Sequence, residues 1–142
     1  MEPFEKKVRQ SFARQLFMST LGAELFSVRD GTVEIRFPFS STLTQQNGFV
    51  HAGAIASILD SACGYAALTV APAEAEVLSV EFKVNLLAPG VGESFVARAS
   101  VKRAGQRLAV CTADAFAVKA GHEKLIATML ATTMNIDSKP RG

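Results

Sequence analysis

The residues best suited to chemistry lie between Gln45 and Asp60, where a polar segment containing His51 runs directly into a long apolar stretch that carries one acid. A carboxylate without a partner costs on the order of several kcal/mol when it leaves water, so we expect Asp60 to face a polar cavity, a partner chain or a substrate. On a helix its neighbours three and four residues away are all small: Ala56, Ser57, Cys63 and Gly64. Another molecule can therefore approach the acid closely. The same pattern also fits a face that packs on another helix, with Asp60 bonded to a backbone amide there.

The segment before this stretch predicts a donor for a negatively charged oxygen. Gly48 and Gly53 allow sharp turns, and the first N–H groups of a helix that starts after His51 point outward with partial positive charge. An acyl carbonyl held by the N–H of Ala52 would be polarised for attack, and losing such a donor costs about 3 to 4 kcal/mol of barrier. A plainer interpretation is that His51 only caps the helix.

Composition limits the molecule that positions these residues. A length of 142 residues fits one domain, which we place at residues 1–137, followed by a flexible tail at 138–142. Hydrophobic residues make up 49% and charged residues 20%, so another subunit is expected to cover part of the surface. A net charge of +2, the absence of Trp and the lack of a basic run with interleaved aromatics argue against a nucleic-acid binder.

The cysteines and the chain start indicate a cytoplasmic protein. Cys63 and Cys111 are isolated, without metal-ligand spacing, and we expect buried reduced thiols and no metal. The start has no signal-peptide pattern, and no apolar run reaches the length needed to cross a bilayer. A basic amphipathic helix that begins at Phe4 and runs to Gly22 is expected to lie against the body of the protein, although a helix at a membrane surface has the same pattern.

The order of the elements predicts an α+β domain in which an antiparallel sheet wraps a central helix. Asp30-Gly31 predicts a tight hairpin turn, and His51 to Val70 has helical periodicity. Four further strands are expected at 77–87, 94–103, 108–119 and 124–136. The first of them alternates apolar and polar residues, which predicts one buried face and one more polar face.

These residues resemble a known family. Gln45-x-x-Gly48-x-x-His51-Ala52-Gly53 followed by Asp60 is similar to the PaaI-like (phenylacetyl-CoA) branch of the hot-dog acyl-CoA thioesterases, within the superfamily that also contains 4-hydroxybenzoyl-CoA thioesterase. That branch has His-Gly-Gly at the start of the central helix and an acid nine residues after the His, and the likeness covers nearly the whole chain. It implies a hot-dog fold and hydrolysis of an acyl- or aryl-acyl-CoA to free acid and coenzyme A.

The resemblance implies a role for each residue of the motif. Asp60 is the general base or nucleophile and acts across a dimer interface on a thioester held by the Ala52 N–H of the other subunit, beside Gly53. Gln45 orients the water or the carbonyl, His51 contacts the thioester, and Ser79 assists the water. Gln45 and Ser79 fit ordinary loop and strand hydrogen bonding equally well. Ala52 stands where the family has Gly, and its methyl group narrows the groove.

Coenzyme A is expected as part of the substrate and no other cofactor is expected. The candidates for binding substrate are Asn47, Gly48, Tyr65, Phe82, Lys102, Arg103 and Arg107. The last three surround a Gly105 turn and suit phosphates, although exposed hairpins often carry such residues. The resemblance implies a homotetramer built from two dimers, and no nucleic-acid or membrane partner is expected.

A non-catalytic module that binds acyl-CoA in the same groove is the main alternative, favoured by Ala52. A hot-dog hydratase is disfavoured because the Asp-x-x-x-x-His arrangement of that branch is missing. The sequence leaves open the acyl group, the choice between CoA and an acyl carrier protein, and whether Asp60 acts as base or nucleophile.

Overall fold

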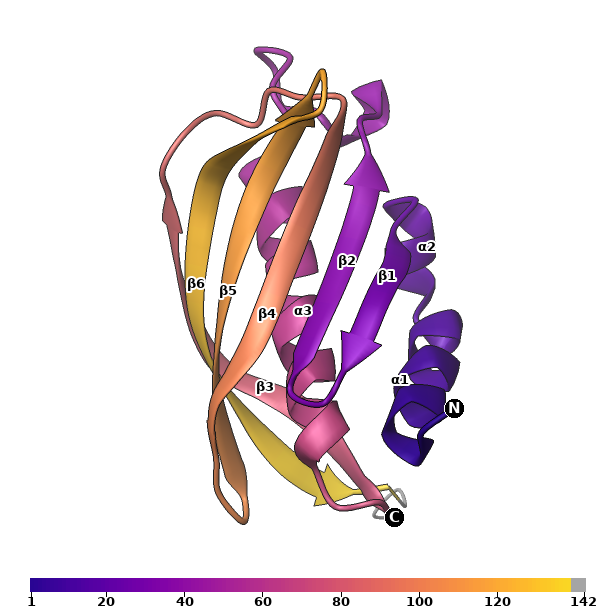
Figure 1. Cartoon of the computed structure of the whole chain (residues 1–142). Coiled ribbons are helices and arrows are strands. Elements are labelled where there is room, and N and C mark those ends of the chain that lie inside the picture. The colour runs from indigo at the N-terminus through magenta and orange to yellow at the C-terminus, as the bar shows by residue number, and fades with distance from the viewer. Residues whose placement is uncertain (139–142) are drawn as a thin grey trace.

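The computed structural model describes residues 1–138, in which two helices and a two-stranded hairpin precede a long helix and four further strands (Figure 1). The described residues form three α-helices, one 3₁₀ turn (Ser41–Leu43) and six strands. The helices are α1 (Pro3–Arg14), α2 (Leu16–Thr20) and α3 (Ala52–Val70), and the strands are β1 (Glu24–Arg29), β2 (Thr32–Pro38), β3 (Ala75–Leu86), β4 (Ser94–Ala104), β5 (Leu108–Lys119) and β6 (His122–Asp137). Of the tail expected at 138–142, residues 139–142 lie outside the described part of the chain.

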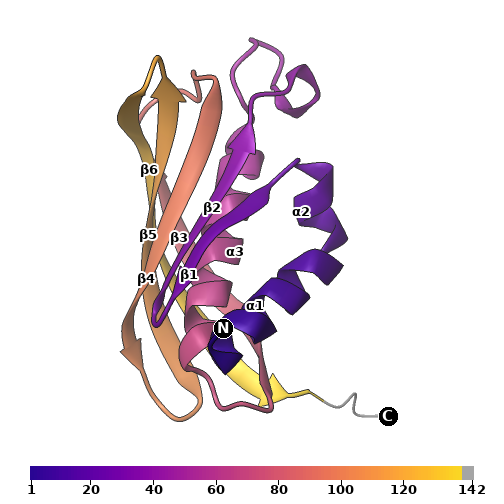
Figure 2. The same ribbon diagram turned by 45° about the vertical axis from the view of Figure 1, so that its right-hand side comes forward.

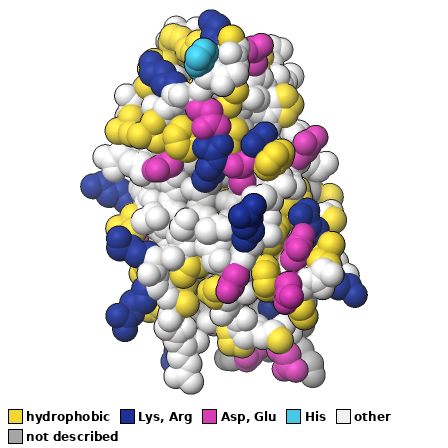
Figure 3. Space-filling model, viewed as in Figure 1, with side chains coloured by type: hydrophobic (Ala, Val, Ile, Leu, Met, Phe, Trp, Pro, Cys, Tyr) yellow, Lys and Arg dark blue, Asp and Glu magenta, His cyan; other side chains and the backbone are white. Residues whose placement is uncertain are grey.

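One antiparallel sheet in the order β1-β2-β4-β5-β6-β3 curves around α3, which confirms the predicted α+β architecture. Helix α3 lies against one face of the sheet, and α1 lies on the side of α3 away from the sheet centre (Figure 2). The opposite face of the sheet carries interspersed positive and negative side chains rather than one basic patch (Figure 3).

Helix α3 is the centre of the core because most of its surface is apolar. Ile58, Leu59 and Ala62 are fully buried, and the helix is about 28 Å long at 1.5 Å per residue. By length and composition α3 could cross a membrane, which differs from the expectation from the sequence. However, 61% of its apolar 18-residue segment is buried inside the fold. The packing identifies α3 as a core helix.

The N-terminal helix differs from the prediction because it breaks at Gln15 instead of continuing to Gly22. Gln15 has an extended backbone (φ −82°, ψ 97°) and its side chain bonds to α3, which turns α2 away from the line of α1. Leu16, whose spacing continues the apolar series of Phe4, Val8 and Phe12 and predicts a place on the same apolar face, is 80% exposed as a result. The Asp30-Gly31 hairpin turn is confirmed, and Gly31 has the positive φ (+78°) that such a turn requires.

Strand β3 also differs, because the expected single buried face is wrong for this chain. It is an edge strand, and a register shift between Ser79 and Glu81 makes Val80 an extra residue, so the alternation changes face there. Leu78 and Phe82, expected on one buried face, are 53% and 46% exposed. The long apolar edge is unpaired within the described chain.

Candidate active site

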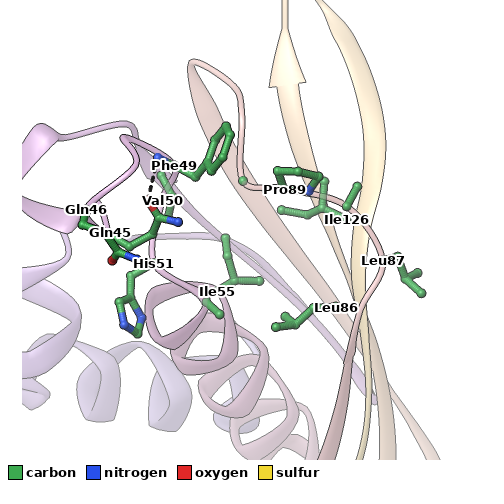
Figure 4. Close-up of a pocket in the computed structure, with 13 residues that line it drawn as sticks. Gln45, Gln46, Phe49, Val50, His51, Ile55, Leu86, Leu87, Pro89 and Ile126 are labelled. Atoms are coloured by element: carbon green, nitrogen blue, oxygen red, sulfur yellow. Dashed lines mark hydrogen bonds between the residues drawn. The ribbon is translucent and has the colours of Figure 1, made fainter.

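A groove of about 560 Å³ opens at the start of α3 (Figure 4). One wall is the polar segment before the helix and the first turn of α3. The other wall, which the sequence did not suggest, comes from the end of β3, the following turn and β6. The lining residues are Gln45, Gln46, Phe49, Val50, His51, Ala52, Ile55, Leu86, Leu87, Ala88, Pro89, Gly90 and Ile126.

Gln45 organises the loop that enters the groove. Its Oε1 accepts hydrogen bonds from the backbone N–H of Asn47 (2.5 Å) and of Phe49 (3.3 Å). Gly48 has φ +85° and donates its N–H to the backbone oxygen of Gln45, which explains a glycine there. The Nε2 amide group of Gln45 has no partner among residues 1–138 and is a free donor at the groove wall.

His51 caps α3 through its ring. Its Nδ1 accepts the N–H of Gly53 at 2.7 Å, which is the capping arrangement that the sequence left open. A Cβ on Gly53 would lie 2.9 Å from that nitrogen, so the glycine permits the contact. Because Nδ1 accepts this bond, a neutral His51 ring carries its proton on Nε2. The Nε2–H group is then a free donor, in addition to the Gln45 amide, and faces solvent.

The backbone N–H of Ala52 is the unoccupied donor at the helix start. Ala54 and Ile55 donate to the backbone oxygen of His51, and Gly53 donates to the His51 ring. Within the described part of the chain, Ala52 N–H has no acceptor. An anionic or polarised oxygen at the mouth of the groove could therefore bind there without displacing an existing bond.

Asp60 lies two turns further along α3 and is half-buried. Its Oδ1 accepts a hydrogen bond from Ser79 Oγ on β3 at 2.6 Å. The bulge at Val80 makes this contact possible, because it turns Ser79 to the same side of the sheet as the fully buried Thr133, with which it pairs. The sequence analysis predicted roles for both Asp60 and Ser79, but a strict alternation along β3 does not predict that they meet.

The free N–H of Ala52 and the carboxylate of Asp60 cannot meet on one small group within a single chain. Eight residues separate them, which is about 12 Å along a helix axis. The N–H groups at a helix start also point away from the body of the helix. The structure thus divides the predicted catalytic residues into two separate sets.

The predicted substrate contacts are widely spread. Tyr65 is 7% exposed under α1, and its hydroxyl accepts hydrogen bonds from Ser11 (3.3 Å) and Gln15 (2.8 Å), so it does not line the groove. Phe82 is exposed on the edge strand and pairs with Ala131. Nothing in the sequence pointed to a role for Gln15, whose side chain links the end of α1 to this side of α3.

Lys102, Arg103 and Arg107 are exposed around the hairpin that joins β4 to β5. This hairpin is at the end of the sheet opposite the start of α3 (Figure 1). Arg98, which lies nearer the start of β4, forms ion pairs with Glu34 (2.6 Å) and Glu123 (2.6 Å) on the outer face of the sheet. The hydrogen bond from Arg98 lowers the pKa of Glu123. Arg98 is thus engaged within its own chain.

No group of three His, Cys, Asp or Glu side chains that could hold a metal occurs in residues 1–138. Cys63 and Cys111 are free and buried, and burial raises the pKa of each thiol. Neither cysteine is suited to act as a nucleophile.

The fold and the residues at the start of α3 define a hot-dog protein, and the chain belongs to the thioesterase superfamily, whose family model matches residues 47–122. The predicted fold and family are confirmed, and the family is one of thioester hydrolases.

A thioesterase family protein from Silicibacter pomeroyi has 51% sequence identity and a TM-score of 0.93, with 95% of this chain and 99% of that chain covered. The PaaI protein of the E. coli phenylacetic acid degradation operon has 17% identity and a TM-score of 0.84 over 94% of each chain, which supports the fold alone. An esterase-like protein from Halobacterium salinarum is 33% identical over 98 residues, which is 66% of this chain. That match spans 64% of the halobacterial protein.

Proposed function

We propose that this protein hydrolyses an acyl-CoA thioester at a site shared by two copies of the chain. The observation that carries the proposal is the pair of separated half-sites on α3. One half-site is the unoccupied N–H of Ala52 beside His51 and Gln45, and the other is Asp60 with its hydrogen bond from Ser79. Family membership supplies the reaction class.

The unpaired edge of β3 offers a way to unite the halves. A long, apolar edge strand is a template for pairing with another chain. Its large side chains are exposed in the single chain, and they are Leu78, Val80, Phe82 and Leu86, followed by Leu87. Two copies that pair antiparallel with the two-fold axis between Phe82 and Lys83 of β3 would bring Ser79 of one chain beside Leu86 of the other. Because Leu86 lines the groove at the helix start, Asp60 of one chain would then approach Ala52 of the other.

The chemistry follows from the donors and acceptors in such a pair. The thioester carbonyl oxygen accepts from Ala52 N–H, with the free Gln45 amide or His51 Nε2–H as a second donor. The Asp60 carboxylate, oriented by Ser79, removes a proton from water as that water attacks the carbonyl carbon. The C–S bond breaks, and the leaving thiolate of coenzyme A takes up a proton. Direct attack by Asp60, followed by hydrolysis of the anhydride, uses the same arrangement.

Coenzyme A is the favoured thiol carrier. The hairpin with Lys102, Arg103 and Arg107 is far from the helix start of its own chain, but an antiparallel pair would bring it to the same end as the helix start of the partner. Three cations there would suit the phosphates of the nucleotide. The proposal extends to a dimer of dimers in solution and to a cytoplasmic location.

Replacement of Asp60 by Asn tests the function. Asp60→Asn keeps an acceptor for Ser79 but removes the base, so turnover should fall by at least about 100-fold on any acyl-CoA that the natural chain cleaves. Asp114→Asn is the matched control, because Asp114 accepts from Thr128 Oγ1 at 2.7 Å on the outer face of the sheet. Equal rates for Asp60→Asn and Asp114→Asn would remove Asp60 from the mechanism.

The alternative is a module that binds acyl-CoA without cleaving it, which the methyl group of Ala52 favours by narrowing the groove. Incubation with a mixed panel of acyl-CoA compounds separates the two functions. Release of free thiol supports hydrolysis, whereas saturable binding without thiol release supports the module.

A further inference from the structure

Gly64 is a glycine that the fold of this chain does not explain. It lies one turn after Asp60 on the same face of α3, in the interior of a helix, where glycine is less stable than alanine. Its backbone does not have positive φ, which is the usual reason for glycine. A Cβ at Gly64 would meet no atom within 4 Å, so close packing is not the reason either. The space above it is unused by the chain itself.

That space has a wall on each side. On one side, Gln15 at the α1–α2 corner is fixed to α3, because its Nε2 donates to Tyr65 Oη (2.8 Å) and its Oε1 accepts from Ser61 Oγ (3.2 Å). On the other side, β3 is fixed to α3 by the hydrogen bond between Ser79 and Asp60. Gly64 therefore lies on the strip of α3 between α1 and β3, directly beyond the proposed catalytic acid.

A contact between α1 and the start of β3 crosses the same strip at its far end. Lys7 of α1 donates to the backbone oxygens of Pro72 (3.1 Å) and Ala75 (2.5 Å), which joins α1 to the start of β3. Leu68, one turn beyond Gly64, is 3% exposed. Figure 2 shows α1 crossing the lower half of α3, while α2 leads away from it. A group that enters at Asp60 would have to stop near Leu68.

We propose that this blind space receives the acyl group of the thioester and that Gly64 sets the largest acyl group accepted. The inference rests on the proposed function and names the substrate class of that site. Coenzyme A cannot occupy the space, because its long arm and charged nucleotide must reach water, whereas the acyl group is the part that ends. About 6 Å of helix separate Asp60 from Gly64, and about 6 Å more lead to Leu68. This length fits an aromatic ring or a medium-length chain and excludes a long fatty acyl chain.

Filling the space is the direct test. Gly64→Leu should lower kcat/KM for phenylacetyl-CoA and octanoyl-CoA by at least about 10-fold, and leave acetyl-CoA within about two-fold of the natural chain. Gly64→Ala should raise the melting temperature by about 2 to 4 °C and lower kcat/KM for the large substrates by about three-fold. Gln10→Leu, which adds the same side chain on the exposed face of α1, is the matched control and should change no substrate preference.

The outcomes separate this inference from the proposed function. If the natural chain cleaves no acyl-CoA, the proposed function fails before Gly64 is tested. Undiminished cleavage of phenylacetyl-CoA and octanoyl-CoA by Gly64→Leu would overturn the inference alone. An equal loss on all acyl-CoA compounds together with dissociation into monomers in sedimentation would also overturn it, because a second copy would then fill the space. If Gly64→Leu does not fold, kcat/KM of Gly64→Ala for phenylacetyl-CoA and octanoyl-CoA decides the test, and unchanged values would overturn the inference.

Discussion

A shared site makes a strong prediction for two inactive chains that are combined. Asp60→Asn removes the acid from one chain, and Ala52→Pro removes the backbone donor from the other. Proline is tolerated at Ala52 because this is the first helical position, its N–H has no acceptor in the described chain, and His51 before it is extended (φ −61°, ψ 136°). Each variant is therefore expected to fold and to lack one half of every site.

The magnitude follows from counting the sites. In a homodimer of Ala52→Pro chains, every site lacks the oxyanion donor, which costs about 3 to 4 kcal/mol or roughly 100- to 1000-fold in kcat. Random pairing of equal amounts of the two variants gives each site an intact Asp60 with a chance of about one half and an intact Ala52 from the partner with the same chance. About one quarter of the sites are then intact. Activity should return to about 25% of that of the natural protein, whether or not dimers pair further.

The assay is thiol release from an acyl-CoA after the two variants are unfolded together and refolded. Each variant refolded alone is the control and should stay near its low parental rate. Mixed protein that is no more active than the average of its parents would refute the shared site. Such a result would mean that each chain holds a complete site, in conflict with the 12 Å estimated between Ala52 and Asp60 along α3.

Three further predictions concern single residues. Ser79→Ala removes the hydrogen bond to Asp60 and should lower kcat about 10-fold with little change in KM, measured by steady-state kinetics; an unchanged kcat would assign Ser79 to the strand alone. Ala120 has φ +50°, so Ala120→Gly should stabilise the fold by about 0.5 to 1 kcal/mol in thermal unfolding, and a lower melting temperature would contradict the strain. Burial raises the pKa of the Cys111 thiol to about 11 and that of Cys63 in the same direction, so neither should react with Ellman's reagent at pH 8 until guanidinium unfolds the chain. Rapid reaction in the native protein would show that the core opens locally.

Local signals in the sequence were sufficient for most of the fold. The long run of small and apolar residues before Pro72 predicted α3, and Asp30-Gly31 predicted the hairpin, because a capped apolar helix and a tight turn depend on neighbouring residues. The break at Gln15 was not predictable in this way. It depends on Ser61 and Tyr65, which are 46 and 50 residues away along the chain.

For the candidate site, the sequence by itself determined which groups are available: an acid in an apolar helix, a helix start preceded by Gln45 and His51, and a hydroxyl at Ser79. Only the tertiary structure decided how they are arranged. A bulge at Val80 turns Ser79 toward Asp60, the His51 ring occupies the N–H of Gly53, and the N–H of Ala52 is left free. The physical reason is that strand register and helix capping are decided by contacts between distant segments, whereas residue types and their spacing are written along the chain.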